Sequence, residues 1–248
     1  KENAEKRSTS TQTWKSVLNL IAPRIWIFGD YRQAENMVVT WAGPIPTLKE
    51  WFRKNEDTHL NLAKLIGKTV QENKIRLPRN LFAKKHWSEF TKTDREERQT
   101  GKNCNHANNY GVGVRKFALM TGLPEKFAAI IQEIHFSLFP EIKSGYQAEI
   151  INQLRHDRTI TLPQGWKRTF YDAYGPDLER AAFAFYGQGT IGLHLIETLR
   201  LLCEFFQSEI PDATVLTPSV IRSQGFDVQL QVHDSVGVSC PNDPETIH

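Results

Sequence analysis

Apolar residues form short β-prone stretches near both ends of the chain. Ile25–Phe28 is apolar and leads directly to Asp30. Residues 226–233 alternate apolar and polar side chains, and apolar character returns in residues 236–239 after Asp234. Alternation on both sides of a short polar segment is typical of a β-hairpin. The pattern therefore predicts two strand regions, each of which presents an aspartate at a strand end or in a turn.

Between these stretches the pattern is mainly helical. In residues 114–121 and 125–139 apolar side chains recur at steps of three and four, the spacing of an amphipathic helix, whereas residues 93–109 predict a polar helix. Thr47 and either Asp57 or Thr58 carry side chains typical of helix N-caps. One predicted helix begins at Ala34 and ends before Pro44. The other predicted helices cover residues 47–52, 58–67, 93–109, 114–121, 125–139, 141–155 and 177–207, and the last of them is interrupted around residues 187–189. A further β-hairpin is predicted over residues 159–162 and 167–170. Residues 70–92 are mixed and polar and are predicted to form a connection. The fold class expected from this order is α+β.

Composition narrows the class of protein without fixing its function. The chain has 248 residues, of which 40% are hydrophobic and 24% charged, and its formal net charge is +3. These values are ordinary for a globular protein and argue against a disordered or collagen-like chain. The near-neutral balance neither establishes nor excludes a nucleic-acid partner. The cysteines, Cys104, Cys203 and Cys240, are too few and too scattered to suggest a disulfide framework or a zinc site, so a reducing compartment is expected.

Asp30 and Asp234 are the first candidates for chemistry. If their strands are neighbours in one sheet, the two carboxylates could share a pair of divalent cations. Two-metal phosphoryl transfer needs such an arrangement, with cations roughly 3.5–4 Å apart. The ion would be a hard, oxygen-preferring one such as Mg²⁺. Taken alone, an aspartate at a strand end is more often only a turn residue, and that reading stays open for either position.

A second constellation lies on the helix predicted from residue 93. Arg98, Lys102, His106 and Tyr110 recur at steps of four, so their side chains lie along one stripe of the helix surface. Guanidinium and ammonium groups there could bind the outer phosphates of a triphosphate, and the phenol could stack on a base. The alternative is a solvated helix face without a ligand.

Several short motifs follow one another along the chain. They are Asp30-Tyr31-Arg32-Gln33-Ala34-Glu35, then Asp57-Thr58-His59, then the stripe from Arg98 to Tyr110 with Gly111, then Arg180, then Gln188-Gly189-Thr190 and finally Gln231-Val232-His233-Asp234-Ser235. In this order and spacing, over about residues 25–241, the chain resembles the catalytic core of family A (DNA polymerase I-like) polymerases. The corresponding family motifs are D-Y-x-Q-x-E, D-x-H, R-x3-K-x3-[F/Y]-x3-Y-G, Q-G-[TS] and V-H-D-E.

The resemblance implies a right-hand architecture, with an antiparallel palm sheet and helical fingers. Residues 25–67 and 157–248 would form the palm, residues 68–156 the fingers, and residues 1–24 a polar N-terminal remnant. The thumb and any proofreading site would be missing, because only 29 residues precede Asp30. We therefore expect the chain to be part of a longer polymerase.

The resemblance also implies roles for individual residues. Asp30 and Asp234 would bind two Mg²⁺ ions, which Mn²⁺ could replace, with help from the backbone carbonyl of Tyr31. The implied nucleotide-binding residues are Gln33, Glu35, His59, Arg98, Lys102, His106 and Tyr110. Among them, Lys102 would also be catalytic, as the proton donor to the leaving pyrophosphate, and Glu35 would exclude a ribose 2′-hydroxyl.

The implied partners are dNTPs and primer–template DNA, which Arg180, Gln188 and His233 would contact near the growing end. No membrane partner is expected, because the apolar stretch of residues 16–28 is short and contains Pro23 and Arg24. The expected location is the cytoplasm, which would be the host cytoplasm for a phage enzyme.

Three positions depart from the family pattern. His106 replaces the usual Phe or Tyr, Ser235 replaces the usual Glu, and Ala184 stands where an Asn is common. The first two departures favour a phage or mobile-element polymerase over a housekeeping repair enzyme.

Two other functions are possible alternatives from the sequence. The sequence His-Asp-Ser also resembles the third motif of phage-type single-subunit RNA polymerases, but Glu35 and the Asp30-Tyr31-x-Gln33 string favour the DNA polymerase. A polymerase-like module that only binds nucleic acid would be favoured by loss of either aspartate, and both are present.

Overall fold

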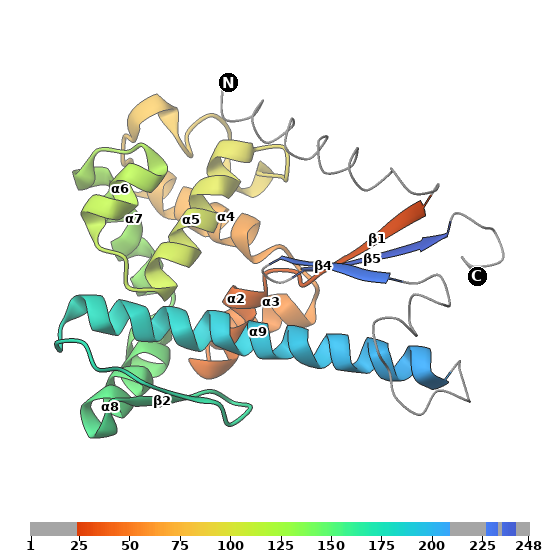
Figure 1. The fold of residues 1–248 in the computed structure, drawn as a ribbon. Helices are drawn as coiled ribbons and strands as arrows, with labels where there is room; N and C mark the ends of the chain where they lie inside the picture. Colours follow the sequence, from red (N-terminus) through yellow and green to blue (C-terminus); the bar gives the residue numbers. More distant parts are fainter. Residues whose placement is uncertain (1–23, 209–226, 233–234, 242–248) are drawn as a thin grey trace. The chain divides into compact units, whose positions relative to one another are not determined.

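The computed structural model describes residues 24–208, 227–232 and 235–241. Figure 1 shows the elements, which are β1 (Arg24–Asp30), α2 (Ala34–Ala42), α3 (Pro46–Arg53), α4 (Thr58–Glu72), α5 (Arg95–Asn109), α6 (Val114–Thr121), α7 (Glu125–Leu138), α8 (Ala148–Asp157), β2 (Thr159–Thr161), β3 (Lys167–Thr169), α9 (Pro176–Ser208), β4 (Asp227–Val232) and β5 (Ser235–Pro241). This mixed, mainly helical fold with small antiparallel sheets confirms the α+β prediction. The chain divides into two compact units, one of residues up to Arg32 and from His194 onward, the other of Gln33–Leu193.

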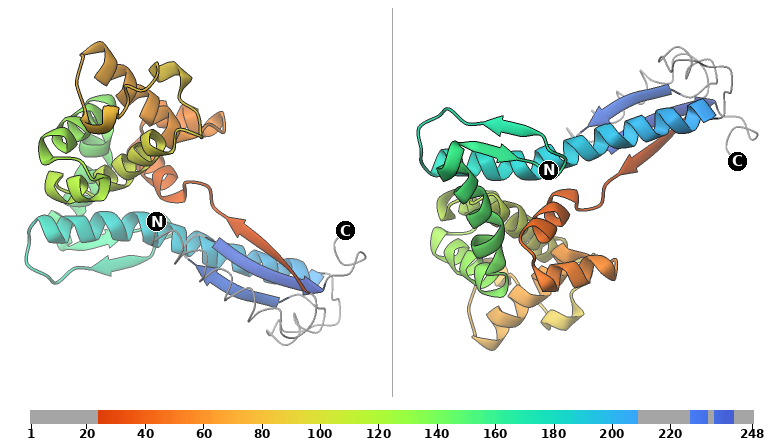
Figure 2. Two further views of the ribbon diagram at one scale, coloured as in Figure 1. Left: turned by 90° about the horizontal axis from the view of Figure 1, so that it is seen from above. Right: turned by 90° about the horizontal axis from the view of Figure 1, so that it is seen from below.

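The smaller unit contains a three-stranded antiparallel sheet in the order β1–β5–β4 (Figure 2). The register of β1 on β5 runs from Arg24 opposite Pro241 to Asp30 opposite Ser235. On the other side of β5, Val232 also pairs with Ser235, and the ladder is irregular between Val228 and Leu230. The predicted strands at both ends of the chain are therefore confirmed, and they are neighbours in one sheet.

The larger unit is built around helices α4 to α7, which pack on one another (Figure 1). Their apolar faces form the core, where Leu62 and Ile66 of α4 lie with Phe117 of α6 and Ile131 of α7, all fully buried. In α7, the period of three and four residues that predicted the helix is also the period of its buried positions. The hairpin of β2 and β3, predicted from the sequence, lies along the first half of α9 (Figure 2), where Gln164 Nε2 donates to the carbonyl of Thr190 at 3.2 Å.

The structure corrects the predicted start of α3 and confirms that of α4. Thr47 is not an N-cap, because the helix begins one residue earlier at Pro46, with Ile45 as the cap. Proline suits the first helical position, where its missing N–H costs nothing and its fixed φ is already helical. For α4 the cap is Asp57, whose side chain accepts from the backbone N–H groups of His59 and Leu60.

Two predicted breaks at glycine residues are wrong. Helix α4 continues past Gly67 to Glu72, and α9 runs without interruption through residues 187–189. In both places the absent side chain makes room for an aromatic ring. A Cβ on Gly67 would lie 2.6 Å from Phe90 Cε2, and one on Gly187 would lie 3.0 Å from the Tyr110 hydroxyl. These glycines allow close packing and do not end their helices.

Most other helix boundaries agree with prediction to within two residues, as expected for frayed ends. The helix expected over residues 141–155 is divided into a π-helical turn at Ile142–Gln147 and the α-helix α8. The expected connection at residues 70–92 is mostly non-helical beyond Glu72, apart from short 3₁₀ turns at Pro78–Asn80 and Trp87–Glu89. Among the described helices, none combines the length and apolar character needed to cross a bilayer.

Candidate active site

Asp30 lies at the last position of β1, where its exposed side chain stands beside the first position of β5. Its pairing partner is Ser235, the residue that follows Asp234 in the sequence. Asp234 and His233 themselves lie outside the described residues. The register nevertheless brings the first and third sequence motifs to the same end of one sheet.

The residue after Asp30 anchors the sheet end to the last part of α9. The hydroxyl of Tyr31 hydrogen-bonds to the hydroxyl of Thr198, which itself donates to the carbonyl of His194 at 2.9 Å. A pocket of about 360 Å³ lies here, lined by residues of β1 and α9 and by Val236 and Val238 of β5. The Asp30 carboxylate and the Tyr31 carbonyl are hard oxygen donors of the kind that Mg²⁺ prefers. Within the described residues no three His, Cys, Asp or Glu side chains cluster as metal ligands.

Helix α5 divides into a buried face and a partly exposed stripe. Gly101, Cys104 and Asn105 face the core, whereas Lys102 is exposed and His106 is 34% exposed. Gly101 allows α5 to approach α4 closely, since a Cβ there would lie 2.4 Å from the carbonyl oxygen of His59. The stripe predicted from the four-residue spacing therefore exists, and α4 lies directly beside it.

Arg98 is held by the residue that caps α4. One oxygen of Asp57, Oδ1, accepts from the backbone N–H groups of His59 and Leu60, each at 3.1 Å. The other, Oδ2, accepts from Nε and Nη2 of Arg98, each at 2.8 Å. Burial raises the pKa of Asp57, but the Arg98 guanidinium and the helix-end amides lower it more, so the carboxyl stays ionised below its usual range. Arg98 is thus oriented before any ligand binds, with 31% of its side chain exposed.

Glu35, Tyr110 and His106 form a compact polar cluster. Tyr110 donates from its hydroxyl to Glu35 Oε2 at 2.5 Å, and His106 Nδ1 lies 3.3 Å from the same oxygen. Burial raises the pKa of Glu35, but hydrogen bonds from His106, Tyr110 and Gln188 lower it more, and the net direction is down. Burial and the Glu35 charge raise the pKa of Tyr110, which therefore stays protonated as the donor. The cluster joins α2, α5 and α9 within the larger unit.

His59 is almost fully buried beside this cluster. Its Nδ1 lies 3.0 Å from the amide nitrogen of Asn105, and its ring centroid is 5.8 Å from that of His106. Burial, reinforced by the charge of His106, lowers the pKa of His59 to about 3, so the imidazole is neutral near pH 7. The sequence predicted His59 as a phosphate ligand, and that role stays a prediction.

A buried network of amide side chains supports these groups, and sequence reasoning missed it. Asn36 donates to Thr58 Oγ1 at 2.9 Å and accepts from Asn109 at 3.1 Å, while Thr58 donates to Gln33. Gln33, predicted to bind nucleotide, is thereby held by α4. The sequence did carry a signal, because asparagine is a poor helix former and α5 contains several.

Arg180 and Gln188, two of the predicted DNA-binding residues, lie on the first half of α9. Arg180 forms an ion pair with Asp177, one turn earlier on the same helix. A Cβ on Gly111 would lie 3.8 Å from Arg180 Cγ, so this arginine borders the end of the Tyr110-Gly111 motif. Gln188 hydrogen-bonds to Glu35 and so belongs to the polar cluster. The remaining residue predicted to contact DNA, His233, lies outside the described residues.

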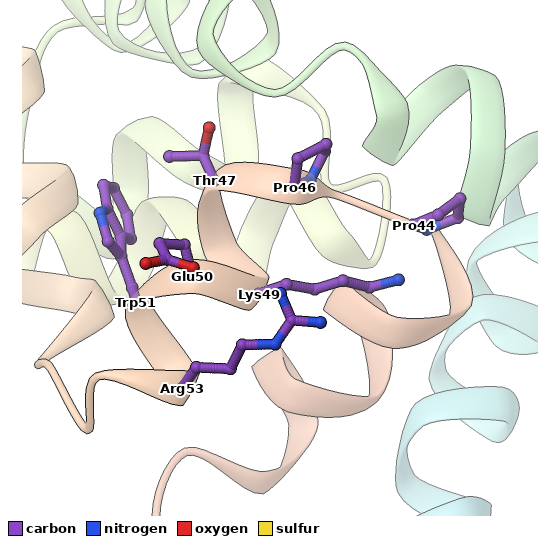
Figure 3. Close-up of a pocket in the computed structure, with 7 residues that line it drawn as sticks. All are labelled: Pro44, Pro46, Thr47, Lys49, Glu50, Trp51 and Arg53. Atoms are coloured by element: carbon purple, nitrogen blue, oxygen red, sulfur yellow. The ribbon is translucent and has the colours of Figure 1, made fainter.

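A separate pocket of about 620 Å³ lies on α3 (Figure 3). Lys49 and Arg53, one helical turn apart, line it together with Glu50, which pairs with Lys54 at 3.2 Å. None of the residues predicted from the sequence motifs lines this pocket.

Comparison with known proteins shows the fold. No family model and no curated protein matches the sequence. Among solved structures, the chain is similar to the POL domain of Pol1 from M. smegmatis in complex with DNA primer-template and dNTP, with a TM-score of 0.67 and 18% sequence identity. The match covers 90% of this chain and 34% of that chain, so this sequence spans about a third of its neighbour. The chain therefore has the fold of a DNA polymerase domain.

Proposed function

We propose that this chain is the palm and fingers of a template-directed DNA polymerase of the family A type. It would add deoxynucleotides to a primer 3′ end and release pyrophosphate. The observation that carries the proposal is the pairing of Asp30 with Ser235 in a chain with a polymerase-domain fold. That register supports a catalytic site at one end of the sheet, to which the first and the third motif, from opposite ends of the chain, would each contribute an aspartate. The palm and fingers boundaries at residues 67 and 156 are part of the proposal.

Asp30, Asp234 and the carbonyl of Tyr31 are the residues proposed to hold two Mg²⁺ ions. Their donors are all oxygen, which suits this ion. When bound, the ions would supply charge stabilisation to the attacking and leaving oxygens. The exposure of Asp30 at the edge of a pocket fits a carboxylate that receives a hydrated ligand. Ser235 brings no second carboxylate beside Asp234.

The stripe of α5 is proposed to bind the incoming nucleotide. Arg98, fixed by Asp57, would contact the outer phosphates through the part of its guanidinium that stays exposed. Lys102, which is exposed one turn later, would neutralise charge that develops on the pyrophosphate and donate a proton to it. A cation that binds the transition state more tightly than the ground state increases the reaction rate more than it increases nucleotide affinity.

Glu35 is proposed to exclude ribonucleotides. Its carboxylate is ionised and held by Tyr110 and His106, so it offers a fixed acceptor and a steric block. A fixed group discriminates between sugars better than a mobile one, because it cannot move aside for the 2′-hydroxyl at low cost. Arg180, Gln188 and His233 would contact the primer–template. The competing RNA polymerase function predicts the opposite sugar preference.

The test is primer extension on a primed DNA template with either dNTPs or NTPs. Asp30→Asn and Asp234→Asn should each lower incorporation at least about a hundredfold, equivalent to about 2.7 kcal/mol, because each removes a shared ligand. Asp157→Asn, an exposed aspartate outside the site, is the matched control and should keep wild-type activity. Extension within a few-fold of wild type in either site variant refutes the two-metal assignment. Efficient extension with NTPs instead establishes the RNA polymerase.

A further inference from the structure

His59 is connected through one amide to a second buried histidine. Asn105 of α5 lies between them, with Nδ2 at 3.0 Å from His59 Nδ1 and Oδ1 at 3.1 Å from His135 Nε2. Asn105 and His135 are both 0% exposed, and His59 is 3% exposed. The three side chains come from α4, α5 and α7, so tertiary packing alone brings them together.

The chemistry of an amide gives this chain of hydrogen bonds a direction. The Asn105 nitrogen can only donate and its oxygen can only accept. His59 must therefore accept at Nδ1 and carry its proton on Nε2. His135 must donate from Nε2, which leaves Nδ1 as an unprotonated acceptor. The structure agrees, because His135 Nδ1 is buried and makes no hydrogen bond with any described residue.

The opposite orientation of the amide is disfavoured. Turning Asn105 round would make His135 Nε2 the acceptor and place the proton of His135 on Nδ1. That N–H would then be a buried donor without an acceptor in the described structure. Buried donors without partners are rarer in proteins than buried acceptors with a spare lone pair. The orientation seen leaves only such a lone pair.

We infer that Asn105 and His135 are positioning residues, which hold His59 as the Nε2–H tautomer so that it presents a hydrogen-bond donor to the phosphates of the incoming nucleotide. The inference rests on the proposed function for the role of the donor, and on the hydrogen bonds alone for the tautomer. Asn105 lies within hydrogen-bond distance of His59, which the sequence predicts to bind the nucleotide, and it acts through that residue. A neutral donor binds phosphate oxygens without adding another charge to the cations already present.

The surroundings of His59 favour this neutral form. The titratable and charged groups that face it are Asp57 on its own element, Arg98, Lys102 and His106 on α5, and His135 on α7 through Asn105. Arg98, Lys102 and His106 disfavour a positive charge on His59, whereas Asp57 favours one. Burial also disfavours this charge and lowers the pKa of His59 to about 3.

The tautomer can be measured without nucleotide. Long-range ¹H–¹⁵N spectra of the whole chain, labelled with ¹⁵N in histidine, distinguish a protonated Nε2 from a protonated Nδ1, and His59→Gln assigns the signal. We expect His59 to show Nε2–H from pH 5 to pH 8. The Nδ1–H tautomer or an imidazolium at pH 6 overturns the inference. His135→Gln keeps a donor for Asn105 and should preserve the tautomer, whereas His135→Phe should not.

The functional arm uses Asn105→Asp. A carboxylate only accepts, so it draws the His59 proton to Nδ1 and leaves the Nε2 lone pair towards the phosphates at high pH. We expect the KM for dNTP in this variant to rise about tenfold from pH 6 to pH 8, while in wild type it stays within about twofold.

Asn103→Asp is the matched control, because it places the same charge on α5 but at a residue that contacts Gln99 and Met120. An equal pH dependence in the control, or none in Asn105→Asp, overturns the inference. Absence of polymerase activity in the wild type contradicts the proposed function instead, and the spectra then still decide the tautomer.

Discussion

Acid should destabilise this protein well above the range in which carboxylates titrate. His59 and His135 are buried and neutral, and burial lowers the pKa of each to about 3. In the unfolded chain a histidine titrates near 6.5. The unfolded state therefore binds more protons than the folded state between these two values. The contribution of the neutral histidines to the free energy of unfolding is therefore fully present above about pH 6.5, and it is lost as the pH falls towards 3.

The size of the effect follows from the same shifts. At pH 5 an ordinary histidine in the unfolded chain is almost fully protonated, which stabilises that state by about 2 kcal/mol. Two buried histidines thus reduce the free energy of unfolding by about 4 kcal/mol between pH 7 and pH 5. Asp57 and Glu35 have lowered pKa values, so their contributions also fall with pH, but mainly below about pH 4.5. The window from pH 7 to pH 5 isolates the histidines.

Urea unfolding followed by circular dichroism at pH 7, 6 and 5 measures this loss. In His135→Phe the slope of stability against pH should fall by about half, whatever the absolute stability of the variant. His156→Gln is the control, because the His156 side chain is 86% exposed and already meets water in the folded state. A change in wild-type stability of less than about 1 kcal/mol from pH 7 to pH 5, or a full slope in His135→Phe, shows that the buried histidines do not cause the loss.

Two further predictions concern the sugar of the nucleotide. Glu35→Ala should raise rNTP relative to dNTP incorporation by at least about tenfold, because it removes both the block and the acceptor that holds Tyr110; an unchanged ratio assigns the discrimination to another residue. His106→Phe should change the ratio of ddNTP to dNTP incorporation several-fold with primer–template affinity unaltered, since phenylalanine cannot hydrogen-bond to Glu35 or to the sugar. Measuring that ratio at two pH values shows whether His106 acts by more than filling space, and no change at either value limits it to packing.

Local pattern alone determined much of this protein. The four-residue spacing of Arg98, Lys102 and His106 required a common stripe on any α-helix, because successive turns superpose such positions. Alternation around Asp234 likewise predicted the strands that flank it. These features depend on the geometry of one segment, and the sequence contains them in full.

Tertiary structure decided which groups meet. The spacing that identified Arg98 contains nothing about Asp57, which holds it from another helix. The asparagine-rich run of α5 hinted at polar contacts, but only packing against α4 and α7 showed that Asn105 joins His59 to His135.

Gly67 and Gly187 also show that contacts between distant segments can outweigh a local preference. A helix end was predicted at Gly67 and an interruption around Gly187, but each glycine lies inside its helix, where an aromatic ring occupies the space beside it. Propensity is a property of a residue and its neighbours in sequence, and it amounts to about 1 kcal/mol for glycine. Burial of a ring such as Phe90 is worth more than that, and it depends on a contact between segments that the sequence does not place side by side.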